Sequence, residues 1–465
     1  SRLGVTGTSG GGAQSSYLTF FESFYKDRLV CSAPFTYITS RDAYMLTGQA
    51  HDSEQNWFGA IAQGIDYDDL VSVHAPKPLM IGAVASDFFC IEGTVESYEQ
   101  LRRVYELYGA ADNLYCVVAP GRHEYSGILR DQVRRFFLRH LAGKDVALVP
   151  GLTSLAGPDE SPLEPPYEIE PHEDETLAPE ELYVTPRRQV ALHLPQAKTV
   201  FDLNLEAWRR RKARRDISPS ALAERRERLK ERVLGKRPRN PLWVRELRSG
   251  VDEETGIGWA QRFTLSEPGI ALPMIELWAA GAKEHGEISV VGVDEGTLAV
   301  SSRREYVVDL VKERRRVLLF DPRGTGAALQ RKINPRDHHV YYGTYYKLNY
   351  DAMMLGDSLF AMWAFDAVRA LEYAHRVARS VHVVGEGTAG IILLAAAVVD
   401  GGVESGAFRK LLDSFESIVT ERFYKAHGVL EVFDLLGLPD VREMLSLLPR
   451  VDAAEFVNGR GEPVA

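Results

Sequence analysis

Short apolar runs alternate along the chain with segments whose apolar residues recur at helical spacing. In residues 1–145, the predicted strands are residues 29–38, the run that ends before Asp87, and residues 114–119. The predicted helices are residues 10–24, 96–108 and 131–141. Strands of mainly apolar residues that alternate with helices are typical of an α/β fold with a mostly parallel central sheet flanked by helices.

The same alternation returns in the last part of the chain. The predicted strands there are residues 259–265, 271–279, 287–293, 317–321 and a run that begins at Ser380. A helix is predicted over residues 357–375, between the last two of these strands. We therefore expect a second α/β domain in this part of the chain.

The stretch between these two parts differs in composition. Residues 151–180 contain nine acidic residues, six prolines and no lysine or arginine, which predicts a solvated linker with little packed structure. Residues 182–194 resemble a short strand pair that turns at residues 185–188. The pattern predicts a domain, a linker, a connector and a second domain, with the boundaries 1–148, 149–181, 182–239 and 240–465.

Residues 208–239 form a basic segment, with fourteen lysines or arginines against four acidic residues. Ser218 and Pro219 predict the start of a helix, and Gly235 predicts its end. A basic helix can bind a phosphate backbone, but acidic residues recur within this one at a spacing that forms ion pairs. Because no aromatic residues are interleaved, we interpret the segment as a solvated face.

Composition and charge exclude several classes of protein. A length of 465 residues suggests about two to four domains, and a net charge of −10 argues against general nucleic-acid binding. No apolar run approaches about 18 residues, so no membrane-spanning helix is expected. The cysteines lack metal-ligand spacing and are too few for a disulfide framework, which predicts buried thiols at Cys31, Cys90 and Cys116. We expect no metal and no cofactor.

A glycine-rich turn follows the first apolar run and has the pattern G-x-S-x-G at Gly7, Ser9 and Gly11. In a nucleophile elbow, the serine ends a strand on a strained turn and opens a helix, and small flanking residues avoid collisions between Cβ atoms and the backbone. The N–H group of Gly10 would then face the oxyanion of an attacked carbonyl. On this motif alone, a plain strand-to-helix turn or a phosphate-binding loop stays open.

Two later residues favour a catalytic serine. Asp87 follows one predicted strand, and His123 lies on the loop after the next. The chain order Ser, Asp, His, with each residue at a strand end, is the order that a hydrolase with a nucleophile elbow requires. His123 would take the proton of Ser9, and Asp87 would hold the imidazole tautomer and stabilise its cation.

On these residues the chain resembles the α/β-hydrolases of the acetyl xylan esterase and prolyl-oligopeptidase-like group. The resemblance rests on residues 7–12, 51–56, 75–79, 86–93 and 123–126. It implies a serine esterase with Ser9 as nucleophile, Asp87 as acid and His123 as base, working through an acyl-enzyme. It also implies an ester substrate, in particular acetylated polysaccharide or oligosaccharide, which would suit a secreted or periplasmic protein.

Two other functions stay open at this point. A prolyl-oligopeptidase-like peptidase would share the triad, but that type normally carries a β-propeller, and no repeat of about 40–50 residues is present. A non-catalytic pair of hydrolase-like domains used for binding would leave the order of Ser9, Asp87 and His123 unexplained.

Candidate substrate-binding residues lie on loops that should border Ser9. Trp57, on the long connection over residues 39–70, and Phe88 offer aromatic faces that suit sugar rings, although Phe88 could equally belong to the core. His51 and Glu54 lie on the same connection. We interpret both as loop-capping residues, because neither lies at a strand end.

Each domain departs from the family pattern. About four strands should precede the elbow and supply a second oxyanion N–H, so we expect an upstream segment or a second chain to complete the first domain.

In the second domain, the run from Ser380 ends in an elbow with Gly387 in place of serine. A dinucleotide-binding fingerprint is the weaker interpretation of this glycine-rich turn. That motif needs an acidic residue about 20 residues after the glycines, and Asp400 lies too close to them. The sequence thus predicts two α/β-hydrolase-like domains, the first without its N-terminal strands and the second non-catalytic and without its C-terminal end.

Overall fold

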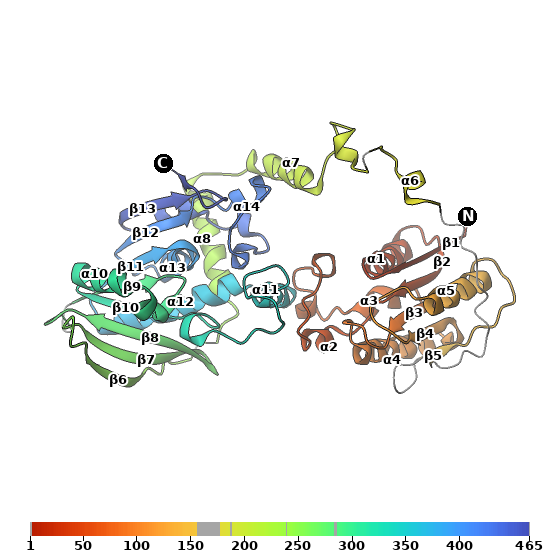
Figure 1. The fold of residues 1–465 in the computed structure, drawn as a ribbon, viewed down its shortest axis with the longest axis horizontal. Helices are drawn as coiled ribbons and strands as arrows, with labels where there is room; N and C mark the ends of the chain where they lie inside the picture. Colours follow the sequence, from red (N-terminus) through yellow and green to blue (C-terminus); the bar gives the residue numbers. More distant parts are fainter. Residues whose placement is uncertain (1, 156–176, 187, 239, 283–285, 465) are drawn as a thin grey trace. The chain divides into compact units, whose positions relative to one another are not determined.

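The computed structural model describes residues 2–155, 177–186, 188–238, 240–282 and 286–464. The chain divides into two compact units, each with its own sheet (Figure 1). Unit 1 comprises Ser1–Leu177 and Ile333–Gly356, and unit 2 comprises Ala178–Lys332 and Asp357–Ala465. Both units combine a sheet with flanking helices, so the predicted α/β class is confirmed.

Unit 1 is built on a parallel sheet whose strands lie side by side in sequence order. The strands are β1 (Leu3–Thr8), β2 (Leu29–Phe35), β3 (Leu79–Val84), β4 (Leu114–Ala119) and β5 (Gly151–Ser154). Because all the strands are parallel, their carboxyl ends lie along one edge of the sheet, where Ser9, Asp87 and His123 follow β1, β3 and β4.

Helices cover both faces of this sheet. They are α1 (Gly10–Tyr25), α2 (Arg41–Met45), α3 (Tyr67–Ser72), α4 (Ile91–Leu107) and α5 (Gly127–His140). In β4, Leu114 and Cys116 join one buried cluster with residues of α1, α3 and α4, whereas Tyr115 and Val117 join another with residues of α5. Successive side chains of a strand point to opposite faces of its sheet, so the two clusters form two layers of the core, one on each face.

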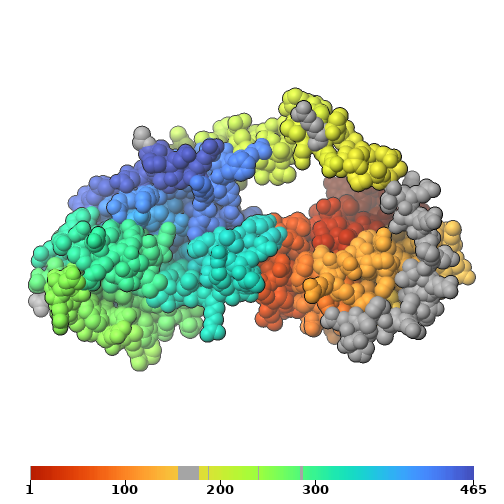
Figure 2. Space-filling view, in the orientation of Figure 1, coloured from red at the N-terminus to blue at the C-terminus, as the bar shows by residue number. Residues whose placement is uncertain are grey.

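Unit 1 also contains a segment from far along the chain. Residues 333–356, which lie between β10 and α12 in sequence and include α11 (Thr344–Met354), pack on residues 48–59 (Figures 1 and 2, teal against orange-red). Asn334 Nδ2 donates to the carbonyl of Gly48 at 3.0 Å, and the N–H of Gly59 donates to the carbonyl of Met353 at 2.9 Å. The first unit is therefore built from two separate stretches of one chain.

Unit 2 has a mixed sheet in the order β14-β13-β12-β11-β9-β10-β8-β7-β6, in which β9 to β13 are parallel and β6, β7, β8 and β14 are antiparallel to their neighbours. The strands are β6 (Arg245–Val251), β7 (Gly258–Glu267), β8 (Ile270–Trp278), β9 (Glu287–Gly292), β10 (Arg316–Phe320), β11 (Ser380–Glu386), β12 (Ser405–Leu412), β13 (Val451–Val457) and β14 (Pro463–Val464).

The helices of unit 2 include one that is almost wholly apolar. They are α6 (Pro179–Leu182), α7 (Val200–Lys212), α8 (Pro219–Leu234), α9 (Ala299–Ser302), α10 (Arg304–Arg314), α12 (Leu359–Val377), α13 (Gly387–Asp400), α14 (Ser417–Thr420) and α15 (Val441–Ser446). Every residue of α13 from Gly390 to Val399 is buried, so this helix forms the centre of the core beside β11 and β12.

Several local predictions were wrong. The described part of residues 182–194 contains no strand pair. Instead, α6 ends at Leu182 and residues 190–192 form a single 3-10 turn. Helix α7 was missed, although Thr199 and Asp202 form a capping box at its start. Helices α4 and α5 begin earlier than predicted; α5 begins after Ser126, whose side chain caps it.

The predicted linker contains two short elements. Gly151–Ser154 form β5, which pairs with β4 at the edge of the first sheet, and α6 begins at Pro179. Residues 156–176 of the acidic stretch lie outside the described residues. Backbone pairing at an edge strand needs no apolar alternation in the side chains, so the composition of this stretch could not indicate it.

Candidate active site

Ser9 occupies a strained turn between β1 and α1. Its backbone dihedrals are φ 56° and ψ −121°, a region that residues other than glycine rarely adopt. The residue stands at the N-cap of α1, where a serine side chain normally accepts a hydrogen bond from its own helix, yet Ser9 makes no such bond. The hydroxyl of Ser9 therefore does not act as a helix cap.

Hydrogen bonds to the end of the neighbouring strand, β2, stabilise the strained backbone conformation of Ser9. The N–H of Ser9 donates to the carbonyl of Phe35 and to Oγ1 of Thr36, both at 3.0 Å. Thr36 also has a positive φ of 48°, and its hydroxyl lies 2.5 Å from that of Thr8. A strained backbone persists only where its surroundings fix it, and here the end of β2 does so.

The glycines around Ser9 have unequal roles. A Cβ on Gly7 would lie 2.4 Å from the carbonyl oxygen of Gly11, and a Cβ on Gly12 would lie 2.5 Å from the carbonyl oxygen of Phe35. A Cβ on Gly11 would meet nothing within 4 Å. The prediction that small residues are needed on both sides thus holds for Gly7 and is wrong for Gly11, because only the backbone of Gly11 faces the turn.

The start of α1 offers donors for a developing negative charge. The first N–H groups of a helix, here including that of Gly10, have no carbonyl one turn earlier to bond, and the helix dipole is positive at this end. A carboxylate oxygen of Glu54 lies 3.5 Å from the position that a Cβ of Gly10 would take. Glu54 therefore borders the elbow, and its main-chain carbonyl accepts a hydrogen bond from the Tyr17 hydroxyl at 2.7 Å.

Asp87 and His123 form a hydrogen-bonded pair at the ends of adjacent strands. Nδ1 of His123 lies 2.9 Å and 3.0 Å from the two carboxylate oxygens of Asp87. The Asp87 side chain is only 2% exposed and also accepts a hydrogen bond from the N–H of Phe89, whereas the imidazole is 25% exposed. A carboxylate at Nδ1 places the proton there and leaves Nε2 as the basic nitrogen.

The three predicted catalytic residues share one edge of the sheet. Within the described residues, no hydrogen bond joins the hydroxyl of Ser9 to His123. Catalytic hydrogen bonds are often long before substrate binds and tighten in the complex. The structure thus places Asp87 and His123 in direct contact and Ser9 at the same strand ends.

Aromatic rings surround the imidazole. The Phe88 ring lies 4.3 Å from that of His123, centroid to centroid, and Phe89 is buried in the core, where it stacks on Tyr44 at 5.1 Å. Phe88 therefore supports the orientation of the base, and a contact with substrate stays a prediction. The guanidinium carbon of Arg41 lies over the Trp57 ring, 4.7 Å from its centroid, so part of the ring surface is already covered.

A buried polar cluster lies behind Phe89. His51 is fully buried, neither of its ring nitrogens has a hydrogen-bond partner, and burial lowers its pKa to about 2. The loop-capping interpretation of His51 is therefore wrong. Arg41, 2% exposed, lies between the rings of Trp57 and Tyr67, while Asp351 from the distant segment approaches His51 at 3.8 Å. No local sequence signal could indicate a contact between residues 300 positions apart.

Unit 2 has a turn of the same kind with glycine at the central position. Gly387 follows β11, opens α13 and has φ 60°, and a Cβ on Gly385 would lie 2.7 Å from the Cα of Gly390. The carboxylate of Asp294 accepts a hydrogen bond from the N–H of Ala389 at 3.0 Å. An acidic side chain thus occupies the start of α13, where an oxyanion would bind.

Within the described residues, no group of three or more His, Cys, Asp or Glu side chains has the arrangement of a metal site. The same residues contain no helix with both the length and the hydropathy of a membrane span. The cysteines are free; Cys31 and Cys116 are buried, which raises each pKa to about 12, and Cys90 is half-buried.

No protein-family model and no curated protein sequence matches the chain. Its structural neighbours are acetyl xylan esterases and glucuronoyl esterases. The acetyl xylan esterase of Paenibacillus sp. is 15% identical with a TM-score of 0.37, over 57% of this chain and 82% of that one. Acetyl xylan esterase 1 of Thermoanaerobacterium sp. is 12% identical with a TM-score of 0.36, over 52% and 89%.

The glucuronoyl esterase of Solibacter usitatus is 13% identical with a TM-score of 0.34, over 50% of this chain and 73% of that one. Acetyl xylan esterases are also the group that the sequence motifs resemble. Because these TM-scores lie below 0.5, the similarity carries no argument about activity, which has to come from the geometry around Ser9.

Proposed function

We propose that the chain is a serine ester hydrolase whose nucleophile is Ser9. The observation that carries the proposal is the hydrogen bond between His123 and Asp87, on the strand edge where Ser9 opens α1 in a strained turn. A base oriented by a buried carboxylate, beside a hydroxyl that caps no helix, is the arrangement that activates a serine.

In this mechanism Ser9 Oγ attacks the ester carbonyl while Nε2 of His123 takes its proton. The N–H of Gly10 donates to the oxyanion of the tetrahedral intermediate, and one such donor contributes roughly 10²–10³ in rate. The intermediate collapses with cleavage of the ester C–O bond, and His123 returns the proton to the leaving alcohol. Water, deprotonated by the same imidazole, then attacks the acyl-enzyme and releases the acid and Ser9.

The substrate class we propose is acetyl esters on polysaccharide or oligosaccharide. The support is the likeness of the motifs to those of acetyl xylan esterases, together with the Phe88 ring beside His123 and the Trp57 ring beside Tyr17 of α1. A small acyl pocket makes few specific contacts, so discrimination would come mainly from the sugar leaving group.

Unit 2 is, in this proposal, a silent second copy of the hydrolase domain. The likeness of the two turns supports it, since Gly387 has φ 60° where Ser9 has φ 56°, and each residue stands where a strand passes into a helix. Glycine has no nucleophile, and Asp294 already bonds the start of α13.

The nucleophile is tested by labelling with a fluorophosphonate. We expect Ser9 to be labelled and Ser9→Ala to abolish labelling. Ser218→Ala is the matched control, because Ser218 also stands at a helix N-cap but bonds its own helix, and labelling should be unchanged. Label that persists on Ser9→Ala would remove the catalytic assignment.

The substrate is tested by comparing rates on acetylated xylan, methyl glucuronate esters, long-chain aryl esters and a prolyl-peptide anilide. We expect acetylated xylan to be the best substrate. A faster rate on the anilide would indicate a peptidase, and a preference for the glucuronate ester would keep a carbohydrate substrate but change the bond that is cleaved.

A further inference from the structure

A large basic cavity lies in unit 2 and includes no residue of the proposed mechanism. Its volume is about 660 Å³, which is within the range of sites that hold a small organic ligand. Helices α7 and α8, with the turn between them, form most of its wall, and Leu436 and Gly437 close one side. Its charged lining comprises two acids and six arginines: Asp216, Glu224, Arg210, Arg211, Arg214, Arg215, Arg225 and Arg228.

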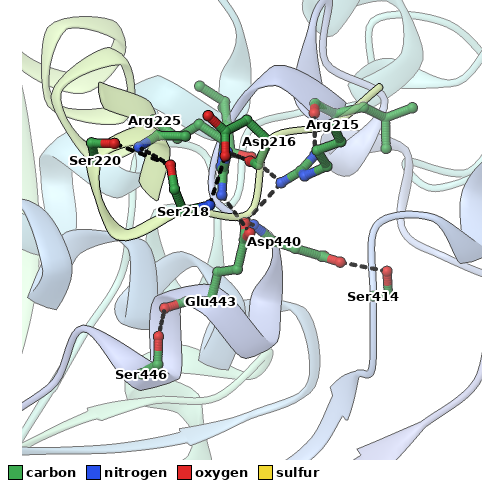
Figure 3. Close-up of polar contacts among 12 residues, drawn as sticks. Arg215, Asp216, Ser218, Ser220, Arg225, Ser414, Asp440, Glu443 and Ser446 are labelled. Atoms are coloured by element: carbon green, nitrogen blue, oxygen red, sulfur yellow. Dashed lines mark hydrogen bonds and ion pairs between the residues drawn. The ribbon is translucent and has the colours of Figure 1, made fainter. Parts of the chain in front are cut away.

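Two of the arginines are fixed by a shared carboxylate. Figure 3 shows Arg215 and Arg225 converging on Glu443, with nitrogen-to-oxygen distances of 2.7 Å and 2.6 Å. Arg215 also donates to the carbonyl of Leu436 at 2.6 Å, and Arg225 donates to that of Asp216 at 2.8 Å. These contacts hold both guanidinium groups rigidly in the wall, so their positions do not depend on a ligand.

The other arginines leave an excess of positive charge. Arg211 pairs with Asp434 at 2.8 Å, and within the described part of the chain the one ion pair of Arg228 is with Glu224, at 4.0 Å. Among the described residues, no carboxylate lies within 4 Å of the side chains of Arg210 or Arg214.

The acid nearest the turn, Asp216, stays ionised. Its carboxylate accepts a hydrogen bond from the N–H of Ser218 at 2.8 Å, and the hydrogen bonds from Ser218 lower its pKa. Its single negative charge therefore offsets one of the six guanidinium groups. The cavity consequently gathers more guanidinium groups than its own carboxylates can pair, and like charges held together are costly unless an anion joins them.

We propose that this cavity binds a multiply charged oxyanion ligand, whose carboxylate or phosphate groups pair with Arg210, Arg214 and Arg228. Guanidinium groups bind both kinds of oxyanion through paired N–H donors, and the volume accommodates a molecule with several such groups. Arg210, Arg214 and Arg228 are exposed, and they come from two helices and the turn between them to line one half-open pocket, with the buried Trp208 in its wall.

The test measures binding to the full-length protein by titration calorimetry, with inorganic tripolyphosphate and tri-galacturonate as probes. We expect a saturable site for at least one of them, weakened as salt rises toward about 0.15 M because the arginines are partly exposed. Binding of tripolyphosphate identifies a phosphate ligand, and binding of tri-galacturonate identifies an acidic sugar. Saturable binding of neither probe would overturn the proposal.

Matched variants locate the site. Arg210→Ala with Arg228→Ala removes one lining charge from each helix and should weaken binding at least about tenfold. Arg209→Ala with Lys230→Ala removes the same charge from the same two helices outside the cavity, and should change affinity by less than about twofold. Equal weakening by both pairs would indicate non-specific attraction to a basic surface and would refute the site.

A third variant separates binding from folding. Ser220 lines the cavity in the first turn of α8, where an acidic residue is favourable to the helix. Ser220→Glu should therefore keep the unfolding temperature while it repels the ligand and abolishes saturable binding. Retained affinity in this variant would contradict the placement of the ligand between α7 and α8.

Discussion

Gly7→Ala should damage the elbow far more than Gly11→Ala, although the G-x-S-x-G pattern treats the two glycines alike. In Gly7→Ala the new Cβ would lie 2.4 Å from the carbonyl oxygen of Gly11 and 2.8 Å from its Cα. Ordinary van der Waals contact begins at 3.4 Å, so β1 and the start of α1 would have to separate by about 1 Å. Backbone atoms cannot rotate out of the way as a flexible side chain can.

The cost follows from this forced separation. Overpacking typically costs about 1–3 kcal/mol, and a clash with the fixed backbone of Gly11 belongs at the upper end. For a unit of this size, about 3 kcal/mol corresponds to a fall of roughly 6–12 °C in unfolding temperature. Because a displacement of about 1 Å can reduce catalysis about a hundredfold, we expect a comparable loss in kcat/KM on an aryl acetate.

Gly11→Ala is the matched control, since its Cβ would meet nothing within 4 Å. We expect its free energy of unfolding to stay within about 0.5 kcal/mol of the parent and its rate within about threefold. The assays are thermal unfolding followed by circular dichroism and initial rates of aryl acetate hydrolysis. If both variants lost activity and stability alike, the steric reasoning about Gly7 would be refuted.

Three further outcomes are expected. Asp87→Asn should lower kcat roughly 10⁴-fold, because the amide favours the wrong imidazole tautomer of His123, and a loss below tenfold in steady-state assays would exclude Asp87 as the orienting acid. His51 has its pKa lowered to about 2 by burial, so below about pH 6.5 the unfolded chain binds one more proton than the folded chain and stability falls as pH falls, by about 1.4 kcal/mol per pH unit. His51→Phe should therefore reduce the stability lost between pH 7 and pH 5 by about 2 kcal/mol in urea unfolding, and an unchanged loss would contradict a buried neutral His51. Gly387→Ser in a Ser9→Ala background should not hydrolyse aryl acetates, because Asp294 already bonds the helix start and the histidine that pairs with an acid, His375 with Asp400, lies at the far end of α13 from Gly387; measurable turnover would refute the silent copy.

Local signals explain what could be predicted from the sequence. Ser9, Asp87 and His123 each follow a short apolar run, and the carboxyl ends of parallel strands necessarily share one edge of the sheet. The glycine turn before α1 is equally local. The chain order of three residue types at three strand ends was therefore enough to predict the pair formed by Asp87 and His123.

Contacts between distant residues explain what could not be predicted. His51 lies beside the carboxylate of Asp351, and the carbonyl of Gly48 accepts a hydrogen bond from Asn334. Both interactions join residues far apart in the sequence, so no window of neighbouring residues contains either one. The positive φ of Thr36 accompanies a contact between its hydroxyl and that of Thr8 at the end of the neighbouring strand, and no feature of its own stretch indicates it. These features need the fold before they can be recognised.

The contribution of residues 333–356 to unit 1 sets an order of events during synthesis. Ser9 and His123 are synthesised before this segment, but the hydroxyl of Tyr346, which contacts Ser53, and the carbonyl of Met353, which accepts from Gly59, come only with it. Nascent chains usually complete domains from the N-terminus onward, whereas the first unit here stays unfinished until residues 333–356 have been made. A protein cut at Leu177 would lack the segment that packs on the loop over residues 48–59.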